Sequence, residues 1–170
     1  RIAPRGVRLA KGVRPADLND KDLLPLLSSG DAWLEEQTRL TLRDRLDANF
    51  LNPAVKEKLA EMAQKAEKPR ARLTALWALA NLGQVPPGLL ANLVNDPDET
   101  VRAWAARLGM GEGRADSSVL KAWITRVQLS GEPSPRVRLA IASSAGRLPE
   151  SDRLDLLLPL TRNLADTTDP

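Results

Sequence analysis

The sequence has 170 residues, the length of about one domain, and a globular composition with 42% hydrophobic and 28% charged residues. It contains no cysteine and no histidine. That excludes a disulfide framework, a zinc site built on those ligands, a histidine general base and a haem held by either residue. We therefore expect this 170-residue chain to bind no metal and no cofactor, and to be non-catalytic.

Positive charge is concentrated at the N-terminus. The net charge at pH 7 is +3, but residues 1–14 hold five basic side chains and no acidic one, which leaves 20 basic and 22 acidic side chains elsewhere. A near-neutral body argues against a nucleic-acid-binding domain, which presents a basic stripe along its fold. No apolar run reaches the ~18 residues of a membrane span. Because the chain begins at Arg1 without a signal-peptide pattern, we expect a segment of a longer protein.

Residues 1–19 show no helical period, because their few aliphatic side chains are scattered among Arg, Gly and Pro. We expect an irregular arm or linker there, whose basic side chains are solvated or contact a membrane surface or an acidic partner. From residue 20 onward, stretches with a helical apolar period alternate with turn residues about every 15 residues. We predict nine helices, near residues 20–28, 32–47, 53–66, 70–82, 86–94, 98–108, 116–129, 135–147 and 152–165.

Turn residues mark the ends of several helices. Asp96-Pro97 and Ser134-Pro135 each place a capping side chain before a proline at the first helical position. Gly83, Gly109 and Gly146 are the expected stops, because glycine readily adopts the left-handed conformation that ends many helices.

Alternate predicted helices share a pattern. An apolar residue followed by arginine opens three of them, at Arg72, Arg102 and Arg138, and Glu35 holds the same place in a fourth. The spacings of 37, 30 and 36 residues fit a unit of two short antiparallel helices, which buries its apolar face only by stacking on neighbouring units. The sequence thus predicts an all-α, right-handed solenoid (a superhelix) of about 4.5 repeats over residues 20–170.

These features resemble HEAT repeats, most clearly in residues 86–109, where a leucine-rich helix, an Asp-Pro turn and a Val-Arg pair follow in order. The resemblance implies that an acidic residue pairs with the arginine six positions later. It therefore implies two structural pairs, Asp96 with Arg102 and Glu132 with Arg138. The first two repeats depart from this pattern, with Ser29 and Glu35 in one and Ala66 and Arg72 in the other.

The order of motifs also resembles a family, the planctomycete-type membrane-bound dehydrogenase proteins. Successive segments of that family are similar to RIAPRG (1–6), DLNDKDLLPLLSSGDAWLEEQTRLTLRDRL (17–46), ARLTALWALANLG (71–83), SPRVRLAIASSAGRLP (134–149) and LLPLTRNLADTTDP (157–170). The resemblance implies a β-propeller before these residues, a c-type haem domain after them and an extracytoplasmic or periplasmic location. It transfers no catalytic residue, because the propeller and the Cys-x-x-Cys-His motif lie outside the matched segments.

The resulting hypothesis is a non-catalytic scaffold: a spacer and protein-interaction module within a larger dehydrogenase. Its partners would be neighbouring domains or another protein, and the second helices of successive repeats would line one concave face. Two alternatives stay open. One is a nucleic-acid-binding module of the HEAT-like DNA-glycosylase type, which holds bases with Trp and a carboxylate in a basic groove. The other is a free-standing scaffold.

The tryptophans bear on this choice. Trp77 and Trp123 lie among leucine and isoleucine at helical spacing, so we expect them in the core or between repeats. Trp104 follows Arg102 on a helix expected to line the inner surface, which makes Trp104 the candidate for partner contact.

Three short motifs have structural explanations. Ser118 and Lys121 match Ser-x-x-Lys, but the companion catalytic motifs are missing, so we expect an exposed helix turn. Residues 109–113 are glycine-rich without a preceding strand or a following Lys-Ser/Thr, so we expect a linker. The acidic residues at 96–99 lack the spacing of calcium ligands, so we expect helix capping.

The last predicted helix has more leucines than one neighbouring repeat would cover. Its apolar stripe is expected to contain Leu154, Leu157, Leu158 and Leu160. Leu156 and Leu164 lie off that stripe, so exposed leucine is expected on the outer side of the helix, where it would promote self-association. Asp169-Pro170 matches Asp96-Pro97, the turn before a second helix, so the fifth repeat is expected to be half present.

Overall fold

The computed structural model describes residues 12–83, 85–110, 115–163 and 166. In that part of the chain every regular element is helical: nine α-helices, two 3-10 segments and one π-helical segment, with no strand. The all-α class and the nine helices expected from the sequence are therefore confirmed. The chain divides into two compact units, Arg1–Val55 and Lys56–Pro170. Among the described helices, none is both long and apolar enough to cross a membrane.

The first unit begins with short turns and ends with one long helix. Its elements are a 3-10 turn at Pro15–Asp17, α1 (Asp20–Leu23), a second 3-10 segment at Leu24–Ser28 and α2 (Ala32–Asp47). The single helix expected for 20–28 tightens after its first turn because Pro25 has no N–H for an α-helical bond. Asn19 and Asp31 start α1 and α2, since each side chain accepts two backbone N–H groups.

Arg45 of α2 hydrogen-bonds to the start of α1 and to the segment before it. Residues 1–11 of the expected arm lie outside the described residues, but the end of the arm is in contact with α2. The Arg45 guanidinium donates to the carbonyl oxygen of Leu18 and, at 2.6 Å, to the Asp20 carboxylate. The same carboxylate accepts the backbone N–H of Asn52 at 2.9 Å. These bonds tie the C-terminal end of α2 and the turn that follows it to one acidic residue within the first unit.

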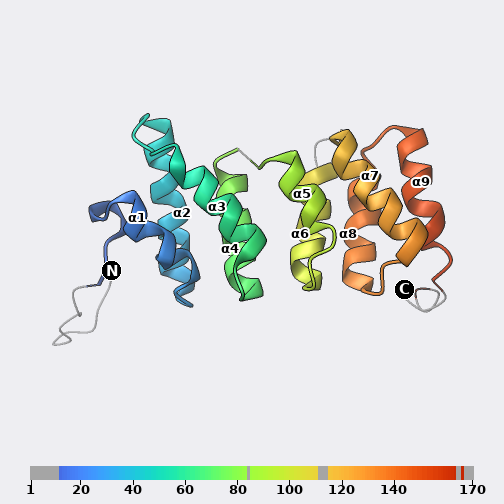
Figure 1. The fold of residues 1–170 in the computed structure, drawn as a ribbon, viewed down its shortest axis with the longest axis horizontal. Coiled ribbons are helices and arrows are strands. Elements are labelled where there is room, and N and C mark those ends of the chain that lie inside the picture. The colour runs from blue at the N-terminus through green and yellow to red at the C-terminus, as the bar shows by residue number, and fades with distance from the viewer. Residues whose placement is uncertain (1–11, 84, 111–114, 164–165, 167–170) are drawn as a thin grey trace, which may run out of the picture. The chain divides into compact units, whose positions relative to one another are not determined.

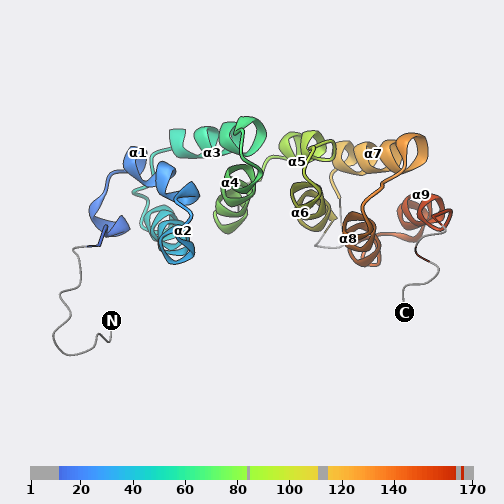
Figure 2. The same cartoon turned by 90° about the horizontal axis from the view of Figure 1, so that it is seen from below.

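The second unit is built from helix pairs. Its elements are α3 (Ala54–Lys65, which begins at the end of the first unit), α4 (Pro69–Asn81), α5 (Pro87–Leu93), α6 (Glu99–Met110), α7 (Ser117–Thr125), the π segment Arg126–Ser130, α8 (Pro135–Ala145) and α9 (Glu150–Leu160). Figures 1 and 2 show α3, α5 and α7 in one layer and α4, α6 and α8 in the other. Within the second layer α4 packs on α6 and α6 on α8. Ala75 and Ala105 are fully buried there, as expected where helices approach closely.

The cap of α6 differs from the sequence prediction. Asp98, and not Asp96, accepts the N–H groups of Thr100 and Val101, at 2.8 and 3.1 Å, and so caps the helix. The carboxylate of Asp96 accepts the N–H of Asp98 at 2.8 Å and turns toward another helix. Ser134 does cap α8 as expected, since its hydroxyl accepts the N–H of Val137.

Two of the expected glycine stops behave differently from each other. Gly83 follows α4 with a φ of 67°, the left-handed conformation expected of a stop. Gly109 does not end α6, which continues to Met110. A Cβ at Gly109 would lie 2.6 Å from Cγ1 of Val119 on α7. Gly109 is therefore required by the close approach of two helices, a contact that the local sequence does not reveal.

The prediction for the faces of α9 is wrong. Leu156, expected on the outer side, is fully buried, whereas Leu154 and Leu158, expected within the apolar stripe, are 47% and 59% exposed. The buried side of α9 is the one that packs on α7 and α8, and on that side Arg153 donates to the carbonyl oxygen of Leu148 at 3.2 Å. Leu156, one turn later, shares that side of the helix. Exposed leucine is present on α9, but at other positions than expected, and Leu164 lies outside the described residues.

Candidate functional site

Three buried arginines, one at the start of each second-layer helix, link successive repeats of the second unit. Arg72 of α4 is the first. Its Nη1 donates to the carbonyl oxygens of Ala66 and Glu67, at 2.8 and 3.0 Å. Its Nε and Nη2 each donate to the carboxylate of Asp96 at 2.8 Å. Arg72 thus holds the turn of its own repeat through the main chain and the turn of the next repeat through a two-pronged ion pair.

Arg102 of α6 repeats this arrangement. Its Nη1 donates to the carbonyl oxygens of Asp96 and Pro97, at 2.7 and 3.1 Å. Its Nε and Nη2 donate to the carboxylate of Glu132, at 3.1 and 2.9 Å. The side chains of both Arg102 and Glu132 are nearly or fully buried. The bonds of each arginine therefore alternate between its own turn and the following one.

Arg138 of α8 is the third arginine. Its Nη1 donates to the carbonyl oxygens of Glu132 and Pro133, both at 2.8 Å, and its Nε donates to the carboxylate of Asp166 at 2.6 Å, with Nη2 on the other carboxylate oxygen. We call these three arginines with Asp96, Glu132 and Asp166 the arginine ladder. Hydrogen bonding to Asp166 raises the pKa of Arg138, and the same bond lowers the pKa of Asp166.

The structure brings together the residues paired by the sequence, but through different atoms. Arg102 meets Asp96, and Arg138 meets Glu132, through the main-chain carbonyl of the acidic residue, while each carboxylate turns to the arginine of the preceding repeat. Sequence reasoning missed Arg72 as a ladder member because Ala66, six positions before it, has no carboxylate. A carbonyl acceptor needs no particular side chain, so alanine serves there as well as aspartate.

Asp166 also differs from the sequence register. The turn of the fifth repeat was aligned on Asp169-Pro170, which lies outside the described residues, whereas the ladder uses Asp166. In the first unit Glu35 occupies the arginine position and is buried, and its carboxylate accepts the N–H of Gly30 at 3.0 Å. The sequence does contain a signal for the ladder: each of its arginines is followed, about one repeat later along the sequence, by an acidic residue.

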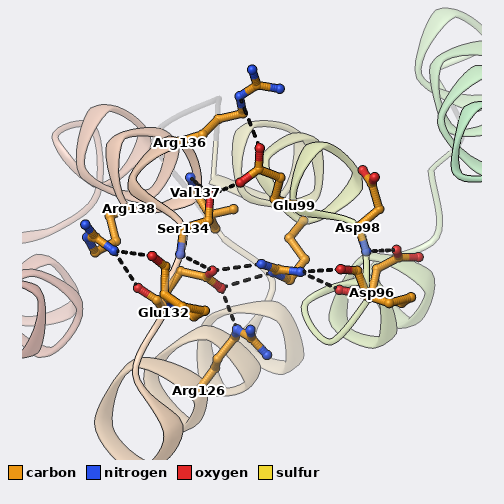
Figure 3. A network of polar contacts seen from close by, with 12 residues as sticks. Asp96, Asp98, Glu99, Arg126, Glu132, Ser134, Arg136, Val137 and Arg138 are labelled. Atoms are coloured by element: carbon orange, nitrogen blue, oxygen red, sulfur yellow. Dashed lines mark hydrogen bonds and ion pairs between the residues drawn. The ribbon is translucent and has the colours of Figure 1, made fainter.

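Glu132 is the most connected residue of the ladder (Figure 3). Besides Arg102, its carboxylate accepts Nε of Arg126 at 2.7 Å and the N–H of Ser134 at 3.0 Å. Burial opposes ionisation of this carboxyl group, but the bonds from Arg102, Ser134 and Arg126 outweigh burial and lower the pKa of Glu132. Figure 3 also shows Arg136 reaching Glu99, at 3.9 Å, beside the Glu132 cluster.

Two tryptophans meet on the second-layer helices. The ring centroids of Trp77 and Trp104 are 5.3 Å apart, with an interplanar angle of 76°, an edge-to-face contact. The Arg107 guanidinium lies 5.3 Å from the centre of the Trp104 ring, within cation–π distance. Trp77 and Trp123 were both expected in the core or between repeats. Trp123 is fully buried, and Trp77 contacts Trp104 of the next repeat but, like Trp104, is partly exposed. Trp104, the candidate for partner contact, therefore lies at the surface between an aromatic edge and a cation.

The exposed side of the second layer follows the repeat register. Counted from the ladder arginine, it is formed by the residues two before, one after and five after. These are Arg70, Leu73 and Trp77 on α4, Thr100 and Arg107 on α6, and Arg136, Leu139 and Ser143 on α8, with Trp104 beside Arg107. Ala103, which holds the remaining register position on α6, is buried. We call this set the second-layer face. Its apolar members include Leu139, which is 66% exposed.

Local structure explains the other sequence motifs where the structure describes them. The N–H and hydroxyl of Ser118 bond to Asp116, which caps α7, and these bonds lower the pKa of Asp116. Of the glycine-rich motif, residues 111–113 lie outside the described residues. Within the described ranges, three or more potential metal-ligating side chains do not converge anywhere. A cavity of about 550 Å³ lies between the π segment and α9, but its buried charged residues, Glu132 and Arg138, are already engaged in the ladder.

Helix pairs in two layers, with one polar contact set recurring in each pair, define a helical-repeat protein. Residues 86–168 match the family of HEAT repeats. This part of the chain is a HEAT-repeat domain, and because HEAT repeats stack into α-solenoids, the fold is of that class. Such modules generally serve as protein-interaction scaffolds and are typically non-catalytic. No curated protein and no solved structure matches the chain significantly.

Proposed function

We propose that this chain is a non-catalytic scaffold that binds a segment of another protein or a neighbouring domain on its second-layer face. The observation that carries the proposal is the partly exposed position of Trp104 between Trp77 and Arg107, on helices held in register by the arginine ladder. Partly exposed aromatic residues beside an arginine are typical centres of protein interfaces. The ladder supplies the rigidity that such a surface needs, because each arginine fixes two successive turns.

We further propose that the scaffold acts as a spacer in a larger extracytoplasmic dehydrogenase, between a β-propeller and a c-type haem domain. Support for this context is the order of five sequence segments similar to that family. The experiment is to sequence the gene on both sides of these residues. Propeller repeats upstream and Cys-x-x-Cys-His downstream are the expected result, and their absence would leave a free-standing scaffold.

Binding at the second-layer face can be tested without knowing the partner. An unbiased library of displayed short peptides is selected on the full chain, and enriched peptides are then measured against variants. Leu139→Glu should abolish their binding, because Leu139 is exposed on this face. Lys121→Glu, on the exposed side of first-layer α7, is the control and should bind normally. Enriched peptides that ignore Leu139→Glu, or a selection that enriches none, would contradict the proposal.

A further inference from the structure

We infer that the second-layer face binds an acidic protein segment that carries an apolar or aromatic side chain beside its carboxylates, an inference that rests on the proposed function. Helices α4, α6 and α8 together carry six arginines and one acidic residue, Glu99. Three of the arginines are neutralised inside the ladder by Asp96, Glu132 and Asp166. Of the other three, Arg107 and Arg136 lie on the exposed side and outnumber Glu99, so this face is positive.

Glu99 offsets only part of this charge. One of its carboxylate oxygens accepts the hydroxyl of Ser134, and the other lies 3.9 Å from Nε of Arg136. Arg136 itself is more than half exposed and also donates to the hydroxyl of Thr100 at 3.2 Å. Glu99 therefore positions Arg136 across the gap between α6 and α8 and leaves much of that guanidinium open to an incoming carboxylate.

Arg107 is the central cation of the site. It is exposed, its guanidinium lies against the Trp104 ring, and no carboxylate in the described part of the chain comes within ion-pairing distance of it. Stacking on an indole holds the plane of a guanidinium and leaves its N–H edge directed outward. That edge can hold a carboxylate with two parallel hydrogen bonds.

Apolar surface lies beside the cations, and this narrows the kind of partner segment that fits the face. Trp77 and Trp104 form one partly exposed aromatic pair, and Leu139 is exposed on the neighbouring helix. An apolar side chain of the partner would cover these residues while its flanking carboxylates reach Arg107 and Arg136. A nucleic-acid strand fits less well, because the exposed Leu139 and Ser143 of α8 interrupt a path of successive phosphate contacts along the face.

The experiment compares three fluorescent probes on the full chain: a peptide of alternating glutamate and leucine, the same peptide with lysine for glutamate, and a single-stranded oligothymidine. The acidic peptide should bind, and its affinity should fall as salt is added. Arg107→Glu should weaken it by about tenfold, because an attraction becomes a repulsion, while Lys121→Glu makes the same charge change in the other layer and should change it less than about twofold. Arg107→Lys, which keeps the charge but not the two-pronged geometry, should lie between wild type and Arg107→Glu.

Each contrary result has a defined meaning. Equal binding of the acidic and basic peptides, equal losses in Arg107→Glu and Lys121→Glu, or tighter binding of oligothymidine would overturn the acidic-segment inference. If library-selected peptides still require Leu139 while the acidic probe does not bind, the scaffold function stands and only the chemistry of the partner is wrong. If neither class of peptide binds, the proposed function fails as well. Circular dichroism and thermal melting of each variant establish that it is folded.

Discussion

Arg102 donates a hydrogen bond to the main-chain carbonyl oxygen of Asp96, at 2.7 Å, while the carboxylate of Asp96 accepts two hydrogen bonds from Arg72 of the preceding repeat. One aspartate thus serves two arginines through two different groups. The turns at Asp96 and at Glu132 are therefore each held from both sides, by the arginine of their own repeat and by that of the repeat before it. Stability of the second unit should therefore depend on the ladder carboxylates more than on other acids.

Removing one ladder carboxylate should be strongly destabilising. In Asp96→Ala the buried Arg72 loses its ion-pair partner, and breaking a buried pair in this way typically costs about 3–5 kcal/mol. The Arg72 and Asp96 side chains are only 8% and 3% exposed, which places the pair in that class. Urea denaturation followed by circular dichroism measures the loss. Glu61→Ala, which removes an exposed pair with Lys65 on α3, is the control and should cost no more than about 1 kcal/mol.

A carboxylate placed six residues before Arg72 should add nothing. Arg72 already uses Nη1 for two carbonyl oxygens and Nε with Nη2 for Asp96. We expect Ala66→Asp to change the free energy of unfolding by less than about 0.5 kcal/mol, as for an ordinary surface substitution. Stabilisation well beyond that amount would mean that a pair of side chains six residues apart is the favourable contact, in conflict with the observed use of the carbonyl.

The repeat register was predictable because it is periodic: arginine recurs at one position of each second helix, and a helix pair recurs around it. The atoms that each arginine contacts were not predictable. An acid six residues before an arginine and an acid one repeat after it are the same residues in a regular array, so the pattern Asp96, Arg102, Glu132, Arg138 fits both pairings. Only Arg72 distinguishes the two pairings, because it has no acid six positions earlier. The structure shows that Arg72 uses the carbonyl oxygen of Ala66 and the carboxylate of Asp96.

The errors at Gly109 and Leu156 share a physical origin. Glycine near the end of an apolar stretch indicates a stop on local grounds, but the helix continues because Gly109 faces Val119 of a neighbouring helix. The buried side of α9 is likewise set by its packing on α7 and α8, and not by the densest row of leucines. Tertiary contacts decided both positions, and neither contact leaves a signal within a few residues of the sequence.

A methyl group at Gly109 should destabilise the fold, and one at Gly88 should not. Gly109→Ala places Cβ 2.6 Å from Val119, so α6 and α7 must separate, at a cost of about 1–3 kcal/mol. Gly88 lies in α5 with no atom near its added Cβ, so Gly88→Ala should be neutral or stabilise by up to about 1 kcal/mol. Both variants gain the same backbone stiffness in the unfolded chain, and the difference between their unfolding free energies isolates the helix contact. Equal values would show that the contact at Val119 relaxes freely.

Acid should unfold an Arg126→Gln variant at a higher pH than the wild type. Burial opposes the charge of Glu132, but three sets of hydrogen bonds, including that from Arg126, hold the pKa of Glu132 below its ordinary value. A carboxyl group with a lowered folded-state pKa contributes stability that is fully present above its unfolded-state pKa and is lost as pH falls through its folded-state pKa. Removing Arg126 raises the folded-state pKa of Glu132 toward the ordinary value, so protonation, and with it the loss of the Arg102 pair, begins at higher pH.

The free energy of unfolding of Arg126→Gln is measured from neutral pH down to about pH 3, a window that spans ordinary carboxyl titration. Lys121→Gln, which removes one exposed positive charge from α7, is the control. Superimposable pH profiles for Arg126→Gln and Lys121→Gln would show that Arg126 does not support the ionised form of Glu132.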